Sequence, residues 1–241
     1  MTYVSAAMLA VPTAGKAAYA EFSTVMAPMI RGLGALRAVD AWGDDVPAGQ
    51  RTDMFRAVEA TPDETPVFSW IEFPDAETAE ACFAAMMAEP EGGQVPQEMP
   101  FDGARMIFAG FEPLCDRGAA RPGDAEVYVD AALFPVAADA REAYAARAVR
   151  MAEAFLEVGA LRCFDGWGVY VPEGKRTDMR RAVALGPDEA LAMGFIEWPS
   201  KAVRDAGWVK LMEGPSLSGL DDGLADMARM IQGGFSMLVD A

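Results

Sequence analysis

Residues 34–58 read GALRAVDAWGDDVPAGQRTDMFRAV, and residues 159–183 read GALRCFDGWGVYVPEGKRTDMRRAV, with 17 of 25 positions identical. Extended without a gap, the match aligns residues 3–90 with residues 128–215, where 36 of 88 positions are identical. The offset of 125 residues is the size of a domain rather than of a solenoid repeat. The chain of 241 residues is therefore two tandem copies of one domain, called here repeat one and repeat two.

The junction between the repeats is a short polar segment. Residues 116–124 read DRGAARPGD and combine charge, Gly and Pro without apolar periodicity, as surface linkers do. We therefore predict a first domain over residues 1–116, a linker over 117–124 and a second domain over 125–241.

Four apolar, β-branched or aromatic runs in repeat one predict its main strands. They cover residues 3–11, 36–46, 67–73 and 106–111. Residues 46–49 read VPAG, which places Pro second and Gly fourth in a turn. We expect the chain to reverse at this turn into a small extra strand over residues 51–60.

Two helices are expected between these strands. Tyr19 and Met26 begin an apolar face at helical spacing, and Gly34 is suited to end that helix because glycine accepts positive φ. Asp75 is placed to cap a second helix that runs to about Glu89. The resulting order, β-α-β-β-α-β, is a ferredoxin-like α+β fold. Because a sheet with helices on one face needs cover on the other, two repeats predict an intramolecular dimeric α/β barrel.

The composition excludes several classes of partner. A formal charge of −17 and a pI near 4.3 repel phosphate backbones and anionic lipids, so we expect neither nucleic acid nor membrane as a partner. No apolar run approaches the roughly 20 residues of a membrane span, and the first residues lack a basic signal segment. Three cysteines at long spacings indicate reduced thiols. These features predict a cytoplasmic protein.

The residue inventory also limits the chemistry. The chain contains no histidine, which removes Ser-His and Cys-His nucleophile pairs, His-ligated haem and most zinc sites. Neither a GxxxxGK[ST] nor a GxGxxG phosphate-binding run is present. We therefore predict no metal site and no cofactor.

Several motifs of repeat one closely resemble a known family. They are residues 42–49 (WGDDVPAG), 55–58 (FRAV), 68–70 (FSW) and 99–113 (MPFDGARMIFAGFEP). In this order they resemble the YbaA-like family of uncharacterised bacterial proteins, a domain of unknown function within the dimeric α/β-barrel superfamily. The resemblance implies the barrel fold and a pocket between sheet and helices like those of related small monooxygenases. It implies no reaction and carries over no catalytic residue.

Repeat two departs from this pattern at two places. Asp44 and Asp45 become Val169 and Tyr170, and the MPFDG block is replaced by residues 223–228, which read GLADMA. A site built on the two aspartates would then belong to repeat one.

Glu72 is the candidate catalytic residue, as a general base. It lies between Trp70 and Phe73 in an apolar strand, where burial is expected to raise the pKa of a carboxyl. The alternative is a strand glutamate that faces solvent or pairs with Arg51 or Arg56.

The candidate ligand-binding residues also have structural alternatives. Trp42 and Trp70 could line a cavity, although aromatic residues on short strands more often fill a core. Asp44 and Asp45 could bind a polar group at a pocket mouth, or serve only as turn residues. The full set is Trp42, Asp44, Asp45, Arg51, Arg56, Trp70 and Met106.

These observations lead to three hypotheses of function. The first is an α/β-barrel protein that binds a small hydrophobic or aromatic ligand in repeat one. The second is a cofactor-independent oxygenase or isomerase that uses Glu72 as base, so whether the chain is an enzyme stays open. The third is a structural or interaction module, favoured if the barrel is packed solid with no ligand-sized cavity near Trp42. The internal pseudo-dimer leaves room for a further homodimer.

Overall fold

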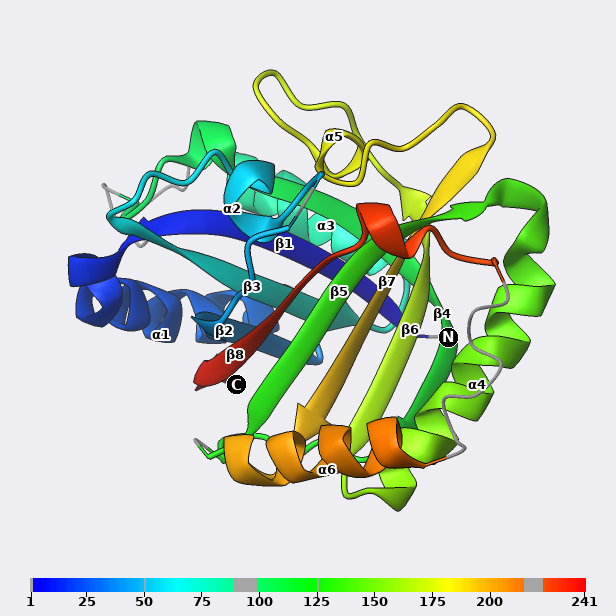
Figure 1. Ribbon diagram of the computed structural model, residues 1–241. Coiled ribbons are helices and arrows are strands. Elements are labelled where there is room, and N and C mark those ends of the chain that lie inside the picture. The colour runs from blue at the N-terminus through cyan, green and yellow to red at the C-terminus, as the bar shows by residue number, and fades with distance from the viewer. Residues whose placement is uncertain (1, 50, 89–98, 125, 215–222) are drawn as a thin grey trace.

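The computed structural model describes residues 2–49, 51–88, 99–124, 126–214 and 223–241 (Figure 1). Repeat one contains β1 (Tyr3–Pro12), α1 (Lys16–Gly32), β2 (Arg37–Asp45), α2 (Met54–Ala57), β3 (Glu64–Phe73), α3 (Ala76–Met87) and β4 (Ile107–Gly118). Repeat two contains β5 (Tyr128–Ala137), α4 (Arg141–Glu157), β6 (Arg162–Tyr170), α5 (Met179–Ala182), β7 (Glu189–Trp198), α6 (Lys201–Glu213) and β8 (Ile231–Asp240).

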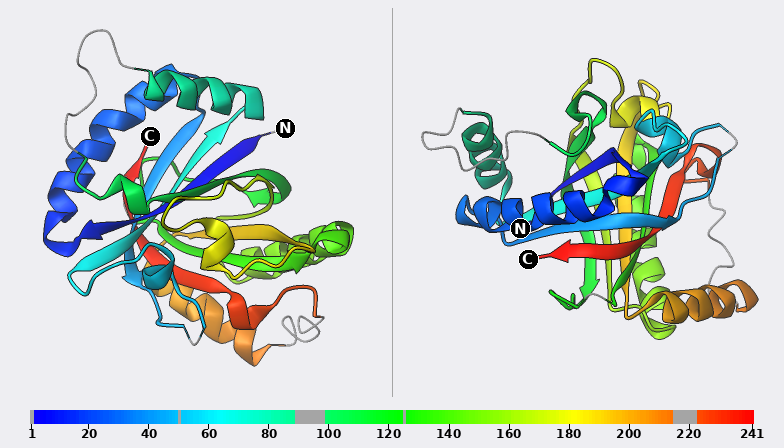
Figure 2. Two further views of the ribbon diagram at one scale, coloured as in Figure 1. Left: turned by 90° about the horizontal axis from the view of Figure 1, so that it is seen from above. Right: turned by 90° about the vertical axis from the view of Figure 1, so that its left-hand side faces the viewer.

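The strands close into one antiparallel barrel in the order β1-β3-β2-β8-β5-β7-β6-β4. Repeat one supplies the sheet β4-β1-β3-β2 and repeat two the sheet β8-β5-β7-β6, so each has the ferredoxin-like order. Two seams join the repeats, because β2 pairs with β8 and β4 pairs with β6. Seen from above, the long helices lie outside the strands (Figure 2). The predicted intramolecular barrel is confirmed.

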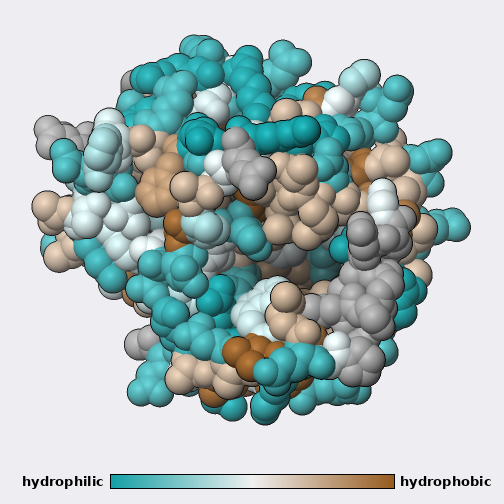
Figure 3. All heavy atoms as spheres, in the orientation of Figure 1, coloured by the Kyte–Doolittle hydropathy of each residue, from teal (hydrophilic) through white to brown (hydrophobic). Residues whose placement is uncertain are grey.

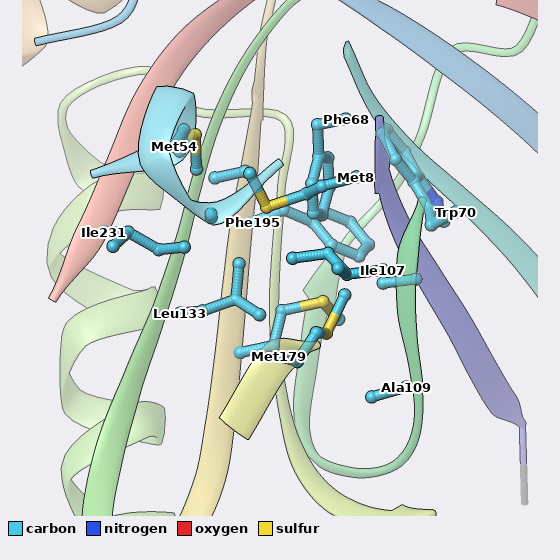
Figure 4. Packing of buried hydrophobic residues seen from close by; sticks show 14 of the residues in the cluster. Met8, Met54, Phe68, Trp70, Ile107, Ala109, Leu133, Met179, Phe195 and Ile231 are labelled. Carbon is cyan, nitrogen blue, oxygen red and sulfur yellow. The ribbon is translucent and has the colours of Figure 1, made fainter. Parts of the chain in front are cut away.

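The interior of the barrel is a packed apolar core shared by both repeats (Figure 4). Trp70 of β3 stacks on Phe195 of β7, with 4.6 Å between ring centroids. Met8 and Phe68 beside them have no exposed surface. Fully burying such side chains contributes on the order of 1.5–3 kcal/mol each. Since side chains fill the interior, open space for a ligand has to lie outside the strands.

Both long helices end as the sequence predicts. Gly34 follows α1 with φ of 105°, and Gly159 follows α4 with φ of 114°, a region that side chains with a Cβ rarely adopt. Asp75 caps α3 by accepting a hydrogen bond from the Thr78 backbone N–H at 2.8 Å. The predicted end of this helix at Glu89 lies outside the described residues.

Two details differ from expectation. The segment 51–60 contains the short helix α2 rather than an extra strand, because Asp53 accepts a hydrogen bond from the Arg56 backbone N–H at 2.7 Å and caps a helical turn. Strand β4 continues to Gly118, two residues into the predicted linker, because its last residues pair with β6 across the seam.

Candidate functional site

Glu72 is buried, but its surroundings do not suit a general base. Arg162 of repeat two donates to both of its carboxylate oxygens, at 2.6 and 3.1 Å, and Trp70 Nε1 donates at 3.2 Å. Burial raises the pKa of Glu72, yet the hydrogen bonds and charge of Arg162 and the charge of Arg37 lower it more, so the net shift is downward. The expected raised pKa is therefore wrong. The alternative of an Arg-paired strand glutamate fits, although its partner is neither Arg51 nor Arg56.

Glu72 belongs to a pseudo-symmetric ion-pair network, the cross-repeat clamp. Its members are Arg37, Glu72, Asp116, Arg162, Glu197 and Asp240. Arg162 pairs with Glu72 and Asp116, and Arg37 pairs with Glu197 and Asp240. The shortest N–O distances in these four ion pairs are 2.6 to 2.8 Å. Each arginine thus holds a β3 or β7 glutamate of the other repeat. Because the donors and acceptors are paired, the network is suited to join the repeats.

The two predicted tryptophans are core residues. Trp70 lies inside the barrel, as described above. Trp42 is 6% exposed and packs on Tyr19, with 6.5 Å between ring centroids, and on Val67. Both side chains therefore pack in apolar clusters, as the structural alternative for these tryptophans expected.

The basic residues and the methionine of the predicted set lie apart on the surface. Arg51, Arg56 and Met106 are exposed. Arg56 donates to the Gly49 carbonyl and pairs with Asp53, which stabilises the local loop. Trp42 and Trp70, by contrast, are buried.

A ligand-sized cavity lies in repeat two, between the outer face of its sheet and helices α4 and α6. Its volume is about 560 Å³. The space-filling view shows the surface hollowed in front of this sheet, with apolar residues beside the hollow (Figure 3). Most of the wall comes from repeat two, and Asp45 and Pro47 come from repeat one. Polar or charged side chains in the wall are Asp45, Asp130, Tyr144, Arg147, Asp165, Arg204 and Gln232.

The sequence predicts a pocket in repeat one, whereas this cavity lies in repeat two, and two aromatic residues of repeat one have no aromatic equivalent there. In repeat one, Phe22 of α1 and Phe101 pack edge to face, with 5.9 Å between ring centroids, and Phe101 also packs on Tyr19. The equivalent positions in repeat two hold Arg147 and Ala225. Arg147 lines the cavity, and Ala225 lies outside its wall, in the cluster that contains the wall residue Tyr144.

Asp45 belongs to repeat one but lines the repeat-two cavity, and Asp44 precedes it at the end of β2. Strand β2 ends beside β8 at the seam, so its last residues reach across to the other repeat. Asp45 pairs with Arg204 of α6 at 2.9 Å, and Asp44 accepts a hydrogen bond from Tyr128 Oη at 3.0 Å. Their equivalents Val169 and Tyr170 lie at the opposite seam, beside the closed repeat.

Asp165 is the titratable group of the cavity. It lies on β6, and Tyr144 Oη of α4 donates to its Oδ1 at 2.5 Å. Burial raises the pKa of Asp165 to about 7, against the opposing effects of the Tyr144 hydrogen bond and the Arg147 charge. Burial and the Asp165 charge raise the pKa of Tyr144 well above its ordinary value, so Tyr144 stays a hydroxyl donor. A carboxyl that titrates near neutrality can take up and return a proton.

Repeat one carries the same pair, with Tyr19 packed against Phe22 and Phe101. Tyr19 Oη donates to Asp40 at 2.6 Å. Burial raises the pKa of Asp40, while hydrogen bonds from Tyr19, Ser69 and Ser23 oppose that rise. The two serine positions carry no hydroxyl in repeat two, where they are Ala148 and Gly194. Asp165 therefore has fewer donors and open space beside it.

Asp165 was not among the predicted residues, although the sequence held a signal. Asp40 and Asp165 are identical at aligned positions, as are Tyr19 and Tyr144. The repeats differ three residues further along the chain, where Phe22 aligns with Arg147. The sequence does not show that the strand of Asp165 and the helix of Tyr144 face one another, so it does not predict their hydrogen bond.

Two structural findings concern metal-binding groups and membrane-spanning helices. Within the described ranges, no group of three or more His, Cys, Asp or Glu side chains is placed to hold a metal ion. In the same part of the chain, no helix has the length and apolar character to cross a membrane.

The fold and cavity define a two-repeat dimeric α/β-barrel protein. The chain belongs to the family described as "Protein of unknown function (DUF1428)", which matches residues 2–103 and again residues 127–227. It is 45% identical over 116 residues to the uncharacterized protein YbaA of Escherichia coli strain K12. That match covers 48% of this chain and 99% of YbaA.

Solved structures of similar fold have low sequence identity. A candidate monooxygenase from Fusobacterium nucleatum has a TM-score of 0.60 at 10% identity, covering 99% of this chain and 93% of its own. A second candidate monooxygenase, from Lactobacillus acidophilus, has a TM-score of 0.58 at 10% identity, covering 100% and 95%. An anthrone oxidase-like protein has a TM-score of 0.53 at 11% identity, covering 100% and 92%. At these identities the likeness shows the fold alone.

Proposed function

We propose that the cavity of repeat two binds a small, largely apolar molecule with a ring-sized body, and that Asp165 accepts a proton from it. The observation that carries this proposal is a carboxyl with a pKa of about 7, hydrogen-bonded to Tyr144, in the wall of a cavity of about 560 Å³. Small-molecule sites typically measure roughly 300–1,000 Å³. The repeat-one pair of Tyr19 and Asp40 provides a matched comparison, with Phe22, Ser23 and Ser69 where repeat two has Arg147, Ala148 and Gly194.

The residues support one defined proton transfer. Asp165 breaks a C–H bond next to a ligand carbonyl, its carboxylate becomes a carboxylic acid, and the electron pair stays on the ligand as an enolate. The Arg147 guanidinium, whose charge already acts on Asp165, offsets the negative charge as it moves from protein to ligand. An apolar ligand also displaces water from Asp165, which raises the pKa of the carboxyl further and strengthens it as a base.

Two reactions can follow from the enolate. In an isomerase, Asp165 returns the proton to a different ligand atom. In a cofactor-independent oxygenase, molecular oxygen reacts with the enolate, so that a CH₂ carbon becomes a carbonyl and the second oxygen atom leaves as water. The similar fold of proteins described as candidate monooxygenases makes oxygen consumption the natural second measurement.

The test uses β-tetralone, a ring ketone with acidic C–H bonds beside its carbonyl. Loss of its α-proton NMR signal in D₂O measures proton abstraction, and an oxygen electrode measures any consumption of O₂. We expect the full chain to accelerate exchange, with a rate that rises through about pH 7 as Asp165 ionises. Asp165→Asn should lower the protein-dependent rate by about 10²–10⁴-fold, the usual contribution of a general base.

Asp40→Asn is the matched control, because it changes the same hydrogen-bonded pair in the closed repeat and should leave the exchange rate unchanged. Binding of β-tetralone without exchange would reduce the proposal to a ligand-binding role. Equal losses in the two variants would remove Asp165 from the reaction.

A further inference from the structure

The mouth of the repeat-two cavity carries an arginine that repeat one lacks. Arg204 of α6 and Asp130 of β5 both line the cavity, and Arg204 Nε donates to Asp130 Oδ1 at 2.9 Å. The aligned residues in repeat one are Ala79 and Ser5. The charged pair therefore occurs at the open cavity and is replaced by small residues at the closed one.

Two tryptophans hold the inner partner of this arginine in place. Trp198 Nε1 and Trp208 Nε1 donate to Asp130 Oδ2 at 3.0 and 2.8 Å. The aligned residues in repeat one are Phe73 and Phe83, whose rings have no N–H to donate. Asp130 is buried and fully engaged, so the Nε side of the arginine is fixed against the sheet.

The Nη1 side of Arg204 is bound less strongly than its Nε side. Its Nη1 pairs with Asp45 of the other repeat at 2.9 Å and with the neighbouring Asp205 at 3.0 Å, and these carboxylate side chains are 53% and 49% exposed. Such ion pairs contribute little net free energy, because water competes for both groups. One edge of the guanidinium is therefore anchored, while the other edge has exposed counter-ions, of which a ligand can replace Asp45.

From this arrangement we infer that Arg204 selects ligands that carry one anionic group, such as a carboxylate or sulfonate, on an apolar body. The anion takes the place of Asp45 on Nη1, and the body enters the cavity between α4, α6 and the sheet. The inference rests on the proposed function, because it assumes that the cavity binds an apolar, ring-sized body. A guanidinium suits this task because it stays charged and presents paired N–H donors to an oxyanion. It also offsets the repulsion that a chain of net charge −17 exerts on an anion.

The test compares two fluorescent probes with the same aromatic body, anilinonaphthalene sulfonate and its uncharged parent N-phenylnaphthylamine. Titration of the full chain should show that both bind and that the sulfonate binds more tightly. Arg204→Gln should lower the preference for the sulfonate by about tenfold and leave the affinity for the neutral probe within about twofold. Asp45→Asn keeps the pairs of Arg204 with Asp130 and Asp205, and should raise sulfonate affinity several-fold by removing one of the two competing counter-ions at Nη1.

Two further variants test where the probes bind and whether the loss of an arginine elsewhere changes their affinity. Ala225→Phe adds, beside the wall residue Tyr144, the ring that Phe101 supplies in repeat one, and should weaken both probes. Arg141→Gln removes an exposed arginine outside the cavity, paired with Glu112, and should change neither affinity. Circular dichroism at each titration temperature verifies that every variant is folded.

Different outcomes contradict the proposed function and the inference about Arg204. If neither probe binds the wild-type chain, the cavity does not take a ring-sized body, and the proposed function fails together with the inference. If both probes bind but Arg204→Gln and Asp45→Asn leave the sulfonate preference unchanged, the inference alone is overturned. The inference alone also fails if Arg204→Gln weakens both probes equally, since Arg204 would then only shape the wall.

Discussion

At the scale of single residues, the burial of a carboxylate was easier to predict than the direction of its pKa shift. Glu72 lies in an apolar strand and is buried, as its neighbours indicated. The direction of its shift depends on Arg162, which lies 90 positions further along the chain and donates from the other repeat. Asp165 has one tyrosine and one nearby arginine to oppose the effect of burial, and its pKa rises. The hydrogen-bonding and charged partners of each carboxylate decide the direction of its pKa shift, and only the folded barrel identifies these partners.

The raised pKa of Asp165 predicts a pH-dependent gain in stability for Asp165→Asn. Its folded pKa, about 7, exceeds the unfolded value near 4, so the folded state binds this proton more tightly. The favourable contribution is complete below about pH 4 and is lost as the pH rises through about 7. Asparagine removes that loss, so the variant should gain stability relative to wild type between pH 5 and pH 8, by at most about 4 kcal/mol.

Urea unfolding of both proteins at pH 5 and pH 8 measures this difference. An advantage that is the same at both pH values would mean that Asp165 does not titrate near neutrality in the folded chain.

At the scale of elements, the sequence predicted most strands and helices but not which repeat would be open. Apolar periodicity fixed the strands, and the glycine and aspartate signals fixed helix ends at Gly34 and Asp75. The turn before residues 51–60 predicts a strand, but the Asp53 cap starts a short helix there instead. The sequence predicts a pocket in repeat one, whereas Asp45 lines a cavity of repeat two, because it acts across the β2–β8 seam, which the sequence does not reveal.

The closed state of repeat one predicts that Phe101→Ala opens a second probe site. Phe101 packs on Tyr19 and Phe22, and its removal should leave a void over the pair of Tyr19 and Asp40. The variant should lose about 2–4 kcal/mol of stability, somewhat less than a fully buried phenylalanine, because Phe101 is only half-buried. Fluorescence titration with N-phenylnaphthylamine should show two sites per chain instead of one.

Ala225→Phe provides the opposite change in repeat two, and should reduce the number of probe sites without a comparable loss of stability. A Phe101→Ala variant that is destabilised but still binds one probe would show that the sheet and helix of repeat one collapse into the void.

At the scale of the whole molecule, the cross-repeat clamp and the two seams make the barrel one folding unit. Neither four-stranded sheet can bury its inner face alone, and each clamp arginine pairs with a glutamate of the other repeat. Removing Arg162 leaves Glu72 and Asp116 without their main counter-ion. Loss of one partner of a buried ion pair costs about 3–5 kcal/mol, because the remaining charge is uncompensated in a low-dielectric site. Arg162→Met should therefore destabilise both repeats together.

Urea unfolding followed by tryptophan fluorescence and by circular dichroism tests this coupling. We expect one cooperative transition in the wild type and in Arg162→Met, shifted to lower urea in the variant, because the strands of each repeat complete the sheet of the other. Arg141→Met is the matched control, since its pair with Glu112 is exposed and its loss should cost about 1 kcal/mol or less. Two separate transitions, or equal losses in the two variants, would show that each repeat is stable by itself and that the clamp does not hold the barrel together.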